Sequence, residues 1–376
     1  MKQPKTIMLA GGGTGGHLFP GIALAQEFRR RFPEVMIVFV GTRKGLESRV
    51  IPPLGYRLAF MNISGMVGKG LREKLRVMGG LPAALIQALV FIVRYKPDLV
   101  IGLGGYASAP MLVAARLAAI PLVIQEQNAF PGVVNRLLAP LAATVFVAFE
   151  EARKHLYSRK IINCGNPVRL DFATQTETGR RGRHELTMLV VGGSQGAHSL
   201  NTAVPEALVR LQAVGVVLKV IHQTGSRDYA QVQAAYQANG IEAEVAEFFP
   251  DMAPQYAAAD LVVSRAGALT LAELALVGRP AILVPYPHAA HDHQDFNARV
   301  FMARGAALMI RDHELNGESL AEMLQPLLQD RSRLQSMQAA AAALGCPRAV
   351  GEIVDRCLGI LSLTTGEVSE AREDAP

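Results

Sequence analysis

Two glycine-rich turns, one at residues 10–17 and one at residues 192–198 (GGSQGAH), hold the residues of this sequence that are best suited to chemistry. The first, AGGGTGGH (residues 10–17), places five glycines in six positions and ends in a histidine. Glycine lets the backbone approach a ligand closely, and the amides at a helix N-terminus favour an anion. This turn is therefore predicted to face a phosphate or diphosphate, and a tight turn without a ligand is the alternative.

The first turn also matches the GxGxxG sequence of dinucleotide-binding proteins, at Gly11, Gly13 and Gly16. Such proteins carry an acidic residue at the end of the second strand, where it binds ribose hydroxyls. Here the expected second strand, VMIVFV, is followed by GTRK (41–44). An NAD(P) site stays open on this evidence, whereas a Walker-type phosphate loop is excluded because the turn lacks GK[ST].

A third segment, SRAGALTLAE (264–273), follows an expected strand and predicts a turn that leads into a helix. The first helical residues are small and uncharged, so their amides could receive the phosphates of a nucleotide. Glu273 lies one to two turns into this helix, where its carboxylate could accept hydrogen bonds from both hydroxyls of a ribose. A solvated carboxylate near the positive end of the helix is the alternative.

The segment PYPHAAHDHQDFNA (285–298) gathers three histidines and two aspartates after another expected strand. A metal site is one interpretation, but the HExxH spacing of helical zinc ligands is absent. The other interpretation is a polar loop whose side chains, such as Gln294 and Asn297, hydrogen-bond the hydroxyls of a ligand.

Nine short β-rich runs alternate with helical segments along both halves, which predicts parallel sheets covered by helices on both faces. The expected strands are TIMLA (6–10), VMIVFV (35–40), DLVIG (98–102), PLVIQ (121–125), TVFVA (144–148), TMLVV (187–191), VVLKVIH (216–222), DLVVS (260–264) and PAILVP (280–285). Residues 6–17 and 187–198 align without gaps at an offset of 181, so we expect an α/β protein of two doubly wound, Rossmann-like domains. We place the first domain at 1–165 and the second at 166–345, with a break at GNP (165–167). The helix 346–360 is expected to complete the first domain, and the acidic segment 361–376 is expected to be a disordered tail.

The net charge of +6 hides an asymmetry between the two halves. Residues 1–165 hold 21 Lys and Arg against 8 Asp and Glu, so the first half should attract anions. Three cysteines without a CxxC pair suit a reducing compartment, and we expect a cytosolic protein. The longest apolar run, 81–93, is shorter than the roughly 20 residues of a spanning helix.

Eight segments together resemble the MurG family of glycosyltransferases. They are AGGGTGGHLFPGIALA (10–25), GLGGYASAP (102–110), EQNAFPGVVNR (126–136), GNPVR (165–169), VVGGSQGAHSLN (190–201), HQTG (222–225), SRAGALTLAEL (264–274) and HDHQDFNA (291–298). The resemblance implies a GT-B fold of two domains facing across a cleft, and transfer of GlcNAc from UDP-GlcNAc to a lipid-linked MurNAc-pentapeptide. The donor would bind the second domain and the lipid acceptor the first, with no nucleic-acid partner and no cofactor.

The resemblance also implies the site residues. Its donor-binding set is Thr14, Gly15, Gly16, Asn128, Arg169, Ser194, Phe249, Ala268, Leu269, Thr270, Leu271, Ala272, Glu273 and Gln294. Its acceptor-binding set is Gly13, His17, Gly104, Gly105 and Tyr106. Whether His293 or Gln294 contacts the donor sugar stays open.

The implied reaction is an inverting transfer, which needs a base for the attacking hydroxyl and positive potential for the departing diphosphate. His17 is the candidate base, and the alternative is that it hydrogen-bonds the backbone or the acceptor diphosphate. Because the sequence has no DxD-like pair after a strand, we expect helix N-termini, the amides around Ser194 and Arg169, rather than a metal, to stabilise the leaving group.

The segment 68–96 mixes six cationic residues with aliphatic ones, which is typical of a segment resting on an anionic membrane. An ordinary helix pair with buried apolar faces is the alternative. The resemblance, together with this segment, implies a peripheral protein at the cytoplasmic face of the bacterial inner membrane. Two other classes remain as alternatives, a UDP-GlcNAc 2-epimerase-like enzyme of the same build and a nonenzymatic NAD(P)-binding module.

Overall fold

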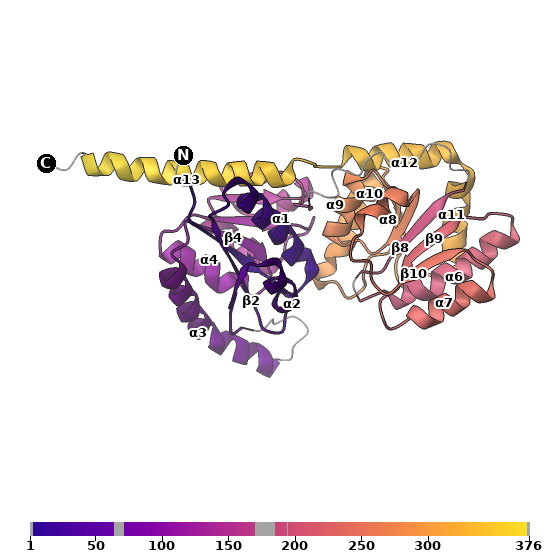
Figure 1. The fold of residues 1–376 in the computed structure, drawn as a ribbon, viewed down its shortest axis with the longest axis horizontal. Coiled ribbons are helices and arrows are strands. Elements are labelled where there is room, and N and C mark those ends of the chain that lie inside the picture. Colours follow the sequence, from indigo (N-terminus) through magenta and orange to yellow (C-terminus); the bar gives the residue numbers. More distant parts are fainter. Residues whose placement is uncertain (1–2, 64–70, 170–184, 194, 374–376) are drawn as a thin grey trace. The chain divides into compact units, whose positions relative to one another are not determined.

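The computed structural model describes residues 3–63, 71–169, 185–193 and 195–373 (Figure 1). The chain divides into two compact units. Unit 1 contains Met1–Arg169 and Pro347–Pro376, and unit 2 contains Leu170–Cys346. Each unit is built on its own parallel sheet, as predicted from the alternation of strands and helices.

The sheet of unit 1 has seven strands in the order β3-β2-β1-β4-β5-β6-β7, and every pairing is parallel. The strands are β1 Thr6–Gly11, β2 Met36–Gly41, β3 Arg57–Phe60, β4 Leu99–Gly104, β5 Leu122–Glu126, β6 Thr144–Val147 and β7 Ile161–Asn163. β1 and β4 are buried along their whole length, which explains their uninterrupted apolar sequences.

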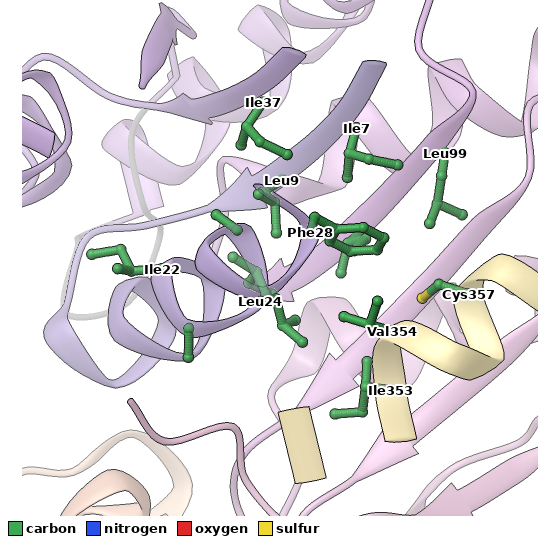
Figure 2. Packing of buried hydrophobic residues seen from close by; sticks show 14 of the residues in the cluster. Ile7, Leu9, Ile22, Leu24, Phe28, Ile37, Leu99, Ile353, Val354 and Cys357 are labelled. Carbon is green, nitrogen blue, oxygen red and sulfur yellow. The ribbon is translucent and has the colours of Figure 1, made fainter. Parts of the chain in front are cut away.

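Helices cover both faces of this sheet. They are α1 Gly15–Arg31, α2 Glu47–Val50, η1 Pro52–Leu54, α3 Leu71–Tyr95, α4 Ser108–Leu117, α5 Val133–Leu138, η2 Ala139–Leu141, η3 Glu150–His155 and α13 Ala349–Glu373. α1 and α13 pack on one face, where Phe28, Val354 and Cys357 meet the strand residues (Figure 2). α3 and α4 supply the buried residues of the opposite face.

The sheet of unit 2 has six strands in the order β10-β9-β8-β11-β12-β13, again all parallel. The strands are β8 Thr187–Val191, β9 Lys219–Gln223, β10 Ala243–Ala246, β11 Leu261–Ser264, β12 Ala281–Leu283 and β13 Ala307–Met309. The helices are α6 His198–Ala213, α7 Tyr229–Ala238, α8 Ala253–Ala258, α9 Ala268–Leu276, η5 Ala290–Asp292, α10 His293–Ala303, α11 Gly317–Gln329 and α12 Arg331–Ala343.

The sequence analysis missed four strands, and all four lie at sheet edges: β3, β7, β10 and β13. Edge strands are covered less completely than central ones, and most residues of these four are partly or fully exposed. They therefore lack the continuous apolar run that revealed the central strands.

The last helix also differs from the expectation. α13 continues from Ala349 to Glu373, through the segment that we expected to be a disordered tail. That segment contains the run GEVSEARE, in which Glu, Ala and Arg are good helix formers although the composition is polar. Composition alone could not distinguish a helix from a disordered tail.

Both sheets reverse their strand order at one point. In unit 1, β1 to β3 are added in one direction along the sheet and β4 to β7 in the other, so the order reverses between β1 and β4. In unit 2 the order reverses in the same way between β8 and β11. Ligands of open parallel sheets bind beyond the carboxyl ends of the strands at such points. The two glycine-rich turns follow β1 and β8, so each lies at the switch point of its own sheet.

Candidate active site

The turn after β1 has a backbone that favours glycine. Gly12 and Gly13 have φ values of +156° and +90°, and α1 begins two residues later at Gly15. The first amides of a helix have no acceptor within the helix, so those of Gly15 and Gly16 are oriented for an anion. Thr14, at the N-cap, and Gly13 are both exposed.

A buried carboxylate, Glu47, anchors this turn. It accepts hydrogen bonds from the amide of Gly13 at 3.0 Å and from the amide and hydroxyl of Thr42 at 2.6 and 3.1 Å. The amide of Gly13, a predicted acceptor-binding residue, is therefore bonded within the protein. The sequence analysis missed Glu47, because nothing in GTRKGLES distinguishes it from a solvated helix residue.

Glu47 also explains why glycines surround it. A Cβ atom built on Gly12, Gly41 or Gly45 would lie 2.2–2.6 Å from the nearest atom of the Glu47 side chain. The three glycines therefore leave the room that the carboxylate occupies.

The turn after β4 packs directly against the turn after β1. Gly104 and Gly105 have φ values of +94° and +78°. A Cβ on Gly105 would lie 2.8 Å from the carbonyl oxygen of Gly12, and one on Gly104 would lie 3.1 Å from the His17 ring. Two of the predicted acceptor residues thus allow the close approach that brings His17 to this switch point, and Tyr106 follows them, partly exposed.

His17 is partly exposed, and its Nδ1 lies 2.8 Å from Gln127 Oε1. Gln127 is buried, and its Nε2 donates to the carbonyl oxygens of Leu103 and Gln125 at 2.8 and 3.1 Å. The sequence analysis singled out Asn128 of the EQN segment and missed Gln127. The residue types alone could not indicate which of the adjacent amides turns toward His17.

Glu126 organises the loop that carries Asn128. Its Oε1 accepts from the amide of Asn128 at 2.9 Å, and its Oε2 accepts from the amide of Gly132 at 3.0 Å and from Asn135 Nδ2 at 2.8 Å. Glu126 is buried with these donors around it, so it serves the loop as an anchor. Arg169, half-buried, is the last residue of the first segment of unit 1.

In unit 2 the turns after β8 and β9 touch through glycine backbones. Gly196 and Gly225 both have φ +73°. A Cβ on Gly196 would lie 1.9 Å from Thr224 O, and one on Gly225 would lie 2.6 Å from Gln195 O. Ser194 lies outside the described residues, so its predicted donor contact stays a prediction.

A buried glutamine fixes the loop that carries Phe249. Gln223 Nε2 donates to Gly193 O at 3.2 Å, and its Oε1 accepts from the amide of Phe249 at 3.0 Å. The ring of Phe249 is buried, as is Gln223. The amide of Phe249, a predicted donor-binding residue, is thus engaged. Its carbonyl oxygen is the backbone group that could contact the uracil of a bound nucleotide.

Beneath this loop lies a buried polar network. His222 Nε2 donates to Asn201 Oδ1 at 3.0 Å, and Tyr236 donates its hydroxyl to His222 Nδ1 at 2.8 Å. Asn201 Nδ2 donates to Thr224 O and to Asp228, each at 2.9 Å. Burial lowers the pKa of His222 to about 3, so the ring is neutral and its two nitrogens play opposite roles.

Arg265, the first residue after β11, joins three neighbouring segments. Its guanidinium donates to Val284 O at 3.2 Å, to Ser199 Oγ at 3.0 Å and to Asp312 Oδ1 at 2.5 Å. Burial works to raise the pKa of Asp312, but the hydrogen bonds from Ser199 and Arg265 outweigh it and lower that pKa. Arg265 thereby fixes the start of the turn that leads into α9.

α9 begins at Ala268 with Gly267 as its N-cap, so the segment 268–273 forms the first turns of a helix as predicted. Leu271 is fully buried, so only its backbone can face a ligand. Glu273 is half-buried, and its carboxylate is hydrogen-bonded to the buried hydroxyl of Tyr256, which also contacts Thr270. Burial and the charge of Glu273 raise the pKa of Tyr256, so the phenol stays protonated and donates to the carboxylate.

The loop before α10 has a strained backbone. His291 and Asp292 have φ values of +53° and +52°, which non-glycine residues rarely adopt. His293 Nδ1 lies 2.8 Å from Ala290 O, and Gln294 Oε1 accepts from the amide of Tyr286 at 3.0 Å. Across the described residues, no group of three His, Cys, Asp or Glu side chains is arranged to hold a metal ion.

The predicted site residues thus fall into two groups, each at the carboxyl edge of one sheet. Gly13, Thr14, Gly15, Gly16, His17, Gly104, Gly105, Tyr106, Asn128 and Arg169 belong to unit 1, and Phe249, Ala268–Glu273 and Gln294 belong to unit 2. This arrangement defines a class of protein. The N-terminal domain of glycosyltransferase family 28 matches residues 7–147, and the C-terminal domain of that family matches residues 187–353. The chain is a glycosyltransferase with the GT-B fold.

Similar proteins define the family more narrowly. The chain is 45% identical over 370 residues to the UDP-N-acetylglucosamine–N-acetylmuramyl-(pentapeptide) pyrophosphoryl-undecaprenol N-acetylglucosamine transferase of Myxococcus xanthus (strain DK1622), covering 98% of this chain and 96% of that one. The crystal structure of Acinetobacter baumannii MurG matches with a TM-score of 0.78 at 31% identity, covering 94% of this chain and 98% of that one. The chain belongs to the MurG family of these transferases, which confirms the resemblance seen in the sequence.

The fold is also that of UDP-GlcNAc 2-epimerases. The enzyme from Neisseria meningitidis, solved with UDP-GlcNAc bound, matches with a TM-score of 0.63 at 13% identity, covering 94% of this chain and 99% of that one. At that identity the likeness shows the fold alone.

Proposed function

We propose that this enzyme transfers GlcNAc from UDP-GlcNAc to the MurNAc 4-hydroxyl of undecaprenyl-pyrophosphoryl-MurNAc-pentapeptide, with inversion at the anomeric carbon. Membership of the family supports the reaction. The structural observation that carries the proposal is the pair of switch points, one in each unit, each with a glycine turn and a helix N-terminus. Donor and acceptor each bring a diphosphate, so each substrate would have one such turn.

On the donor side, the first turn of α9 would receive the UDP phosphates, and Glu273 would accept hydrogen bonds from the ribose hydroxyls. The bond from Tyr256 supports this role, because it holds the carboxylate in one orientation before the donor arrives. The carbonyl of Phe249 would contact uracil. Gln294 and His293 remain alternatives for the GlcNAc hydroxyls.

On the acceptor side, His17 would act as general base, since its ring lies at the switch point of unit 1 between the two glycine turns. The resemblance assigns Gly15 and Gly16 to the donor, and their amides at the start of α1 would face a diphosphate, whereas the amide of Gly13 is bonded to Glu47. Arg169 and the amides around Ser194 would neutralise the charge that develops on departing UDP.

A transfer assay tests the proposal directly. The full-length protein is incubated with UDP-GlcNAc labelled in the sugar, with and without the lipid-linked muramyl acceptor, and label in the lipid phase is counted. We expect label in the lipid phase only when acceptor is present. Conversion of UDP-GlcNAc to its 2-epimer without acceptor would instead support the epimerase, and binding of NAD(P)H without turnover would support the nonenzymatic module.

We also propose that unit 1 docks on an anionic membrane through α3. Ile86, Val90 and Val93 recur at helical spacing on this helix and are 63%, 56% and 72% exposed. Leu117 at the end of α4 and Leu137 on α5 add two further exposed aliphatic side chains, 66% and 71% exposed, on helices that contact one another. Large apolar side chains gathered in this way are typical of an interaction surface.

Cations accompany this apolar surface: Arg94, Lys96 and Arg116 are exposed nearby in the chain. The side chains of Lys69, Arg72, Lys74 and Arg76 lie outside the described residues. No helix in the described part of the chain is long and apolar enough to span a bilayer. Vesicle sedimentation tests the docking, and a Val90→Asp variant should bind anionic vesicles more weakly. Binding that ignores both lipid charge and salt would contradict the proposal.

A further inference from the structure

A row of amide side chains leads away from His17 through the interior of unit 1. Gln127 Oε1 lies 2.8 Å from His17 Nδ1, Gln127 Nε2 lies 2.5 Å from Gln125 Oε1, and Gln125 Nε2 lies 3.3 Å from Asn166 Oδ1. The three amides are 5% exposed or less. They come from β5, from the turn after it and from the segment that follows β7.

The surroundings of Gln127 decide which way its amide points. Its Nε2 faces the backbone carbonyls of Leu103 and Gln125 at 2.8 and 3.1 Å, and a carbonyl oxygen can only accept. The reverse orientation would set Oε1 against these oxygens. Gln127 therefore presents Oε1 to His17, and Oε1 also can only accept.

The consequence for His17 follows from the chemistry of imidazole. Since Gln127 Oε1 accepts, Nδ1 of His17 must donate, and a neutral imidazole carries one N–H. The other nitrogen, Nε2, then carries the lone pair. This is the form that a general base needs if Nε2 faces the substrate.

We propose that Gln127 is a positioning residue, supported by Gln125 and Asn166, that holds His17 in the Nδ1–H tautomer and keeps Nε2 available as the base. The inference rests on the proposed role of His17. Gln127 Nε2 has two hydrogens for three oxygens, so one hydrogen is shared between the backbone and side-chain oxygens of Gln125. With that sharing, the contacts run in one direction, from His17 toward Asn166, and each polarises the next. Within the described structure Asn166 Nδ2 has no partner, and the row ends there.

Ionisable groups near this turn do not replace Gln127 in that role. Glu47 accepts from Gly13 and Thr42, and Glu126 accepts from Asn128, Gly132 and Asn135. Tyr106 lies beside the turn, with a ring carbon 3.8 Å from where a Cβ of Gly13 would stand. The amide of Gln127, rather than a carboxylate, therefore sets the tautomer.

The first test is spectroscopic and does not depend on an activity measurement. Two-bond ¹H–¹⁵N correlation spectra of the uniformly labelled full-length protein distinguish the two tautomers of each histidine, and the His17→Ala variant assigns the His17 signals among the nine histidines. We expect Nδ1–H for His17 at neutral pH. Nε2–H, or an equal mixture, would overturn the proposal.

The second test uses graded variants. Gln127→Met keeps the volume and removes the acceptor, so the Nδ1–H preference should be lost and kcat should fall roughly 10- to 100-fold, with KM for UDP-GlcNAc changed less than about threefold. Gln125→Met should have a smaller effect of the same kind, because Gln127 keeps its bonds to the two backbone carbonyls.

Thr144→Val is the control. Thr144 is as deeply buried as Gln127 in the same unit, lies on β6 outside the site, and donates its hydroxyl to Ala143 O at 2.9 Å. This variant also removes a buried hydrogen bond at constant volume, and it should leave both the His17 spectrum and kcat unchanged. A loss of kcat in Thr144→Val equal to that in Gln127→Met would overturn the proposal, because it would show a general effect of destabilising the unit.

The two proposals can fail separately. If His17→Ala retains kcat, His17 is not the base, whereas the spectra still report whether Gln127 sets its tautomer. If Gln127→Met loses the Nδ1–H preference and kcat stays at the level of the unaltered enzyme, the link between tautomer and catalysis is wrong.

Discussion

The hydrogen bond between Tyr256 and Glu273 offers the sharpest test of the donor site. Tyr256 lies in α8, is buried, and donates its hydroxyl to the carboxylate that we assign to the ribose. Tyr256→Phe removes one oxygen atom without emptying the ring position. The carboxylate keeps its place in α9 but loses the group that orients it before UDP-GlcNAc binds.

The magnitude follows from the kind of bond that is lost. A hydrogen bond to a charged group contributes about 1.5–3 kcal/mol. If misorientation of Glu273 costs about 1 kcal/mol of the free energy of donor binding, KM for UDP-GlcNAc rises roughly fivefold. The change in kcat should be small, since neither residue contacts the reacting atoms. Initial rates at saturating acceptor and varied UDP-GlcNAc measure both constants.

Tyr236→Phe is the control for this experiment. Tyr236 is as deeply buried in the same unit, and its hydroxyl is likewise engaged, with His222 at 2.8 Å. Both variants should lower the free energy of unfolding, but only Tyr256→Phe should raise KM for the donor. Equal KM values in the two variants would refute the orienting role of Tyr256, and an unchanged KM in Glu273→Gln would refute the ribose contact itself.

Three further predictions concern the glycine turns and the buried histidine. Glu47→Gln should lower the free energy of unfolding of unit 1, measured in urea, by about 1–3 kcal/mol, because one of the Gly13 and Thr42 donors loses its acceptor. The exposed control Glu34→Gln should change it little. Equal effects of the two variants would contradict the anchoring role of Glu47. Gly196→Ala should destabilise unit 2 more than Gly240→Ala. Both positions have a positive φ, which costs an alanine roughly 1–2 kcal/mol, but only at Gly196 would the Cβ also meet a backbone oxygen. Equal losses in the free energy of unfolding would show that the turns can separate freely. The pKa of His222 is depressed in the folded protein, so the unfolded chain binds a proton more readily, and the contribution of neutral His222 to the free energy of unfolding is present above pH 6.5 and is lost toward pH 3. Between pH 5.5 and 4.5 this group should lower the free energy of unfolding in urea by about 1.4 kcal/mol per pH unit, and a His222→Gln variant with the same slope would contradict this.

The central strands could be predicted from the sequence because they are buried on both faces. β1, β4 and β8 are continuous apolar runs that end in glycine turns, and their positions followed from this alone. The edge strands β3, β7, β10 and β13 carry no such run, since they have a neighbour on one side only. Periodicity therefore revealed the centre of each sheet and missed its borders.

The site was predictable to a similar extent. Glycines at a switch point and a histidine after them are visible in the sequence, because the chemistry depends on residue type and local spacing. Glu47 and Gln127 were missed because their roles come from contacts across the fold. Glu47 accepts from Gly13, 34 residues away, and Gln127 contacts His17, 110 residues away.

In the proposed reaction, main-chain amides and Arg169 neutralise the departing diphosphate without a bound cation. The most direct measurement is the rate of GlcNAc transfer to the lipid acceptor by enzyme freed of metals and assayed in excess EDTA. We expect the same rate of transfer with EDTA as with added magnesium. Loss of transfer in EDTA, restored by magnesium, would contradict it.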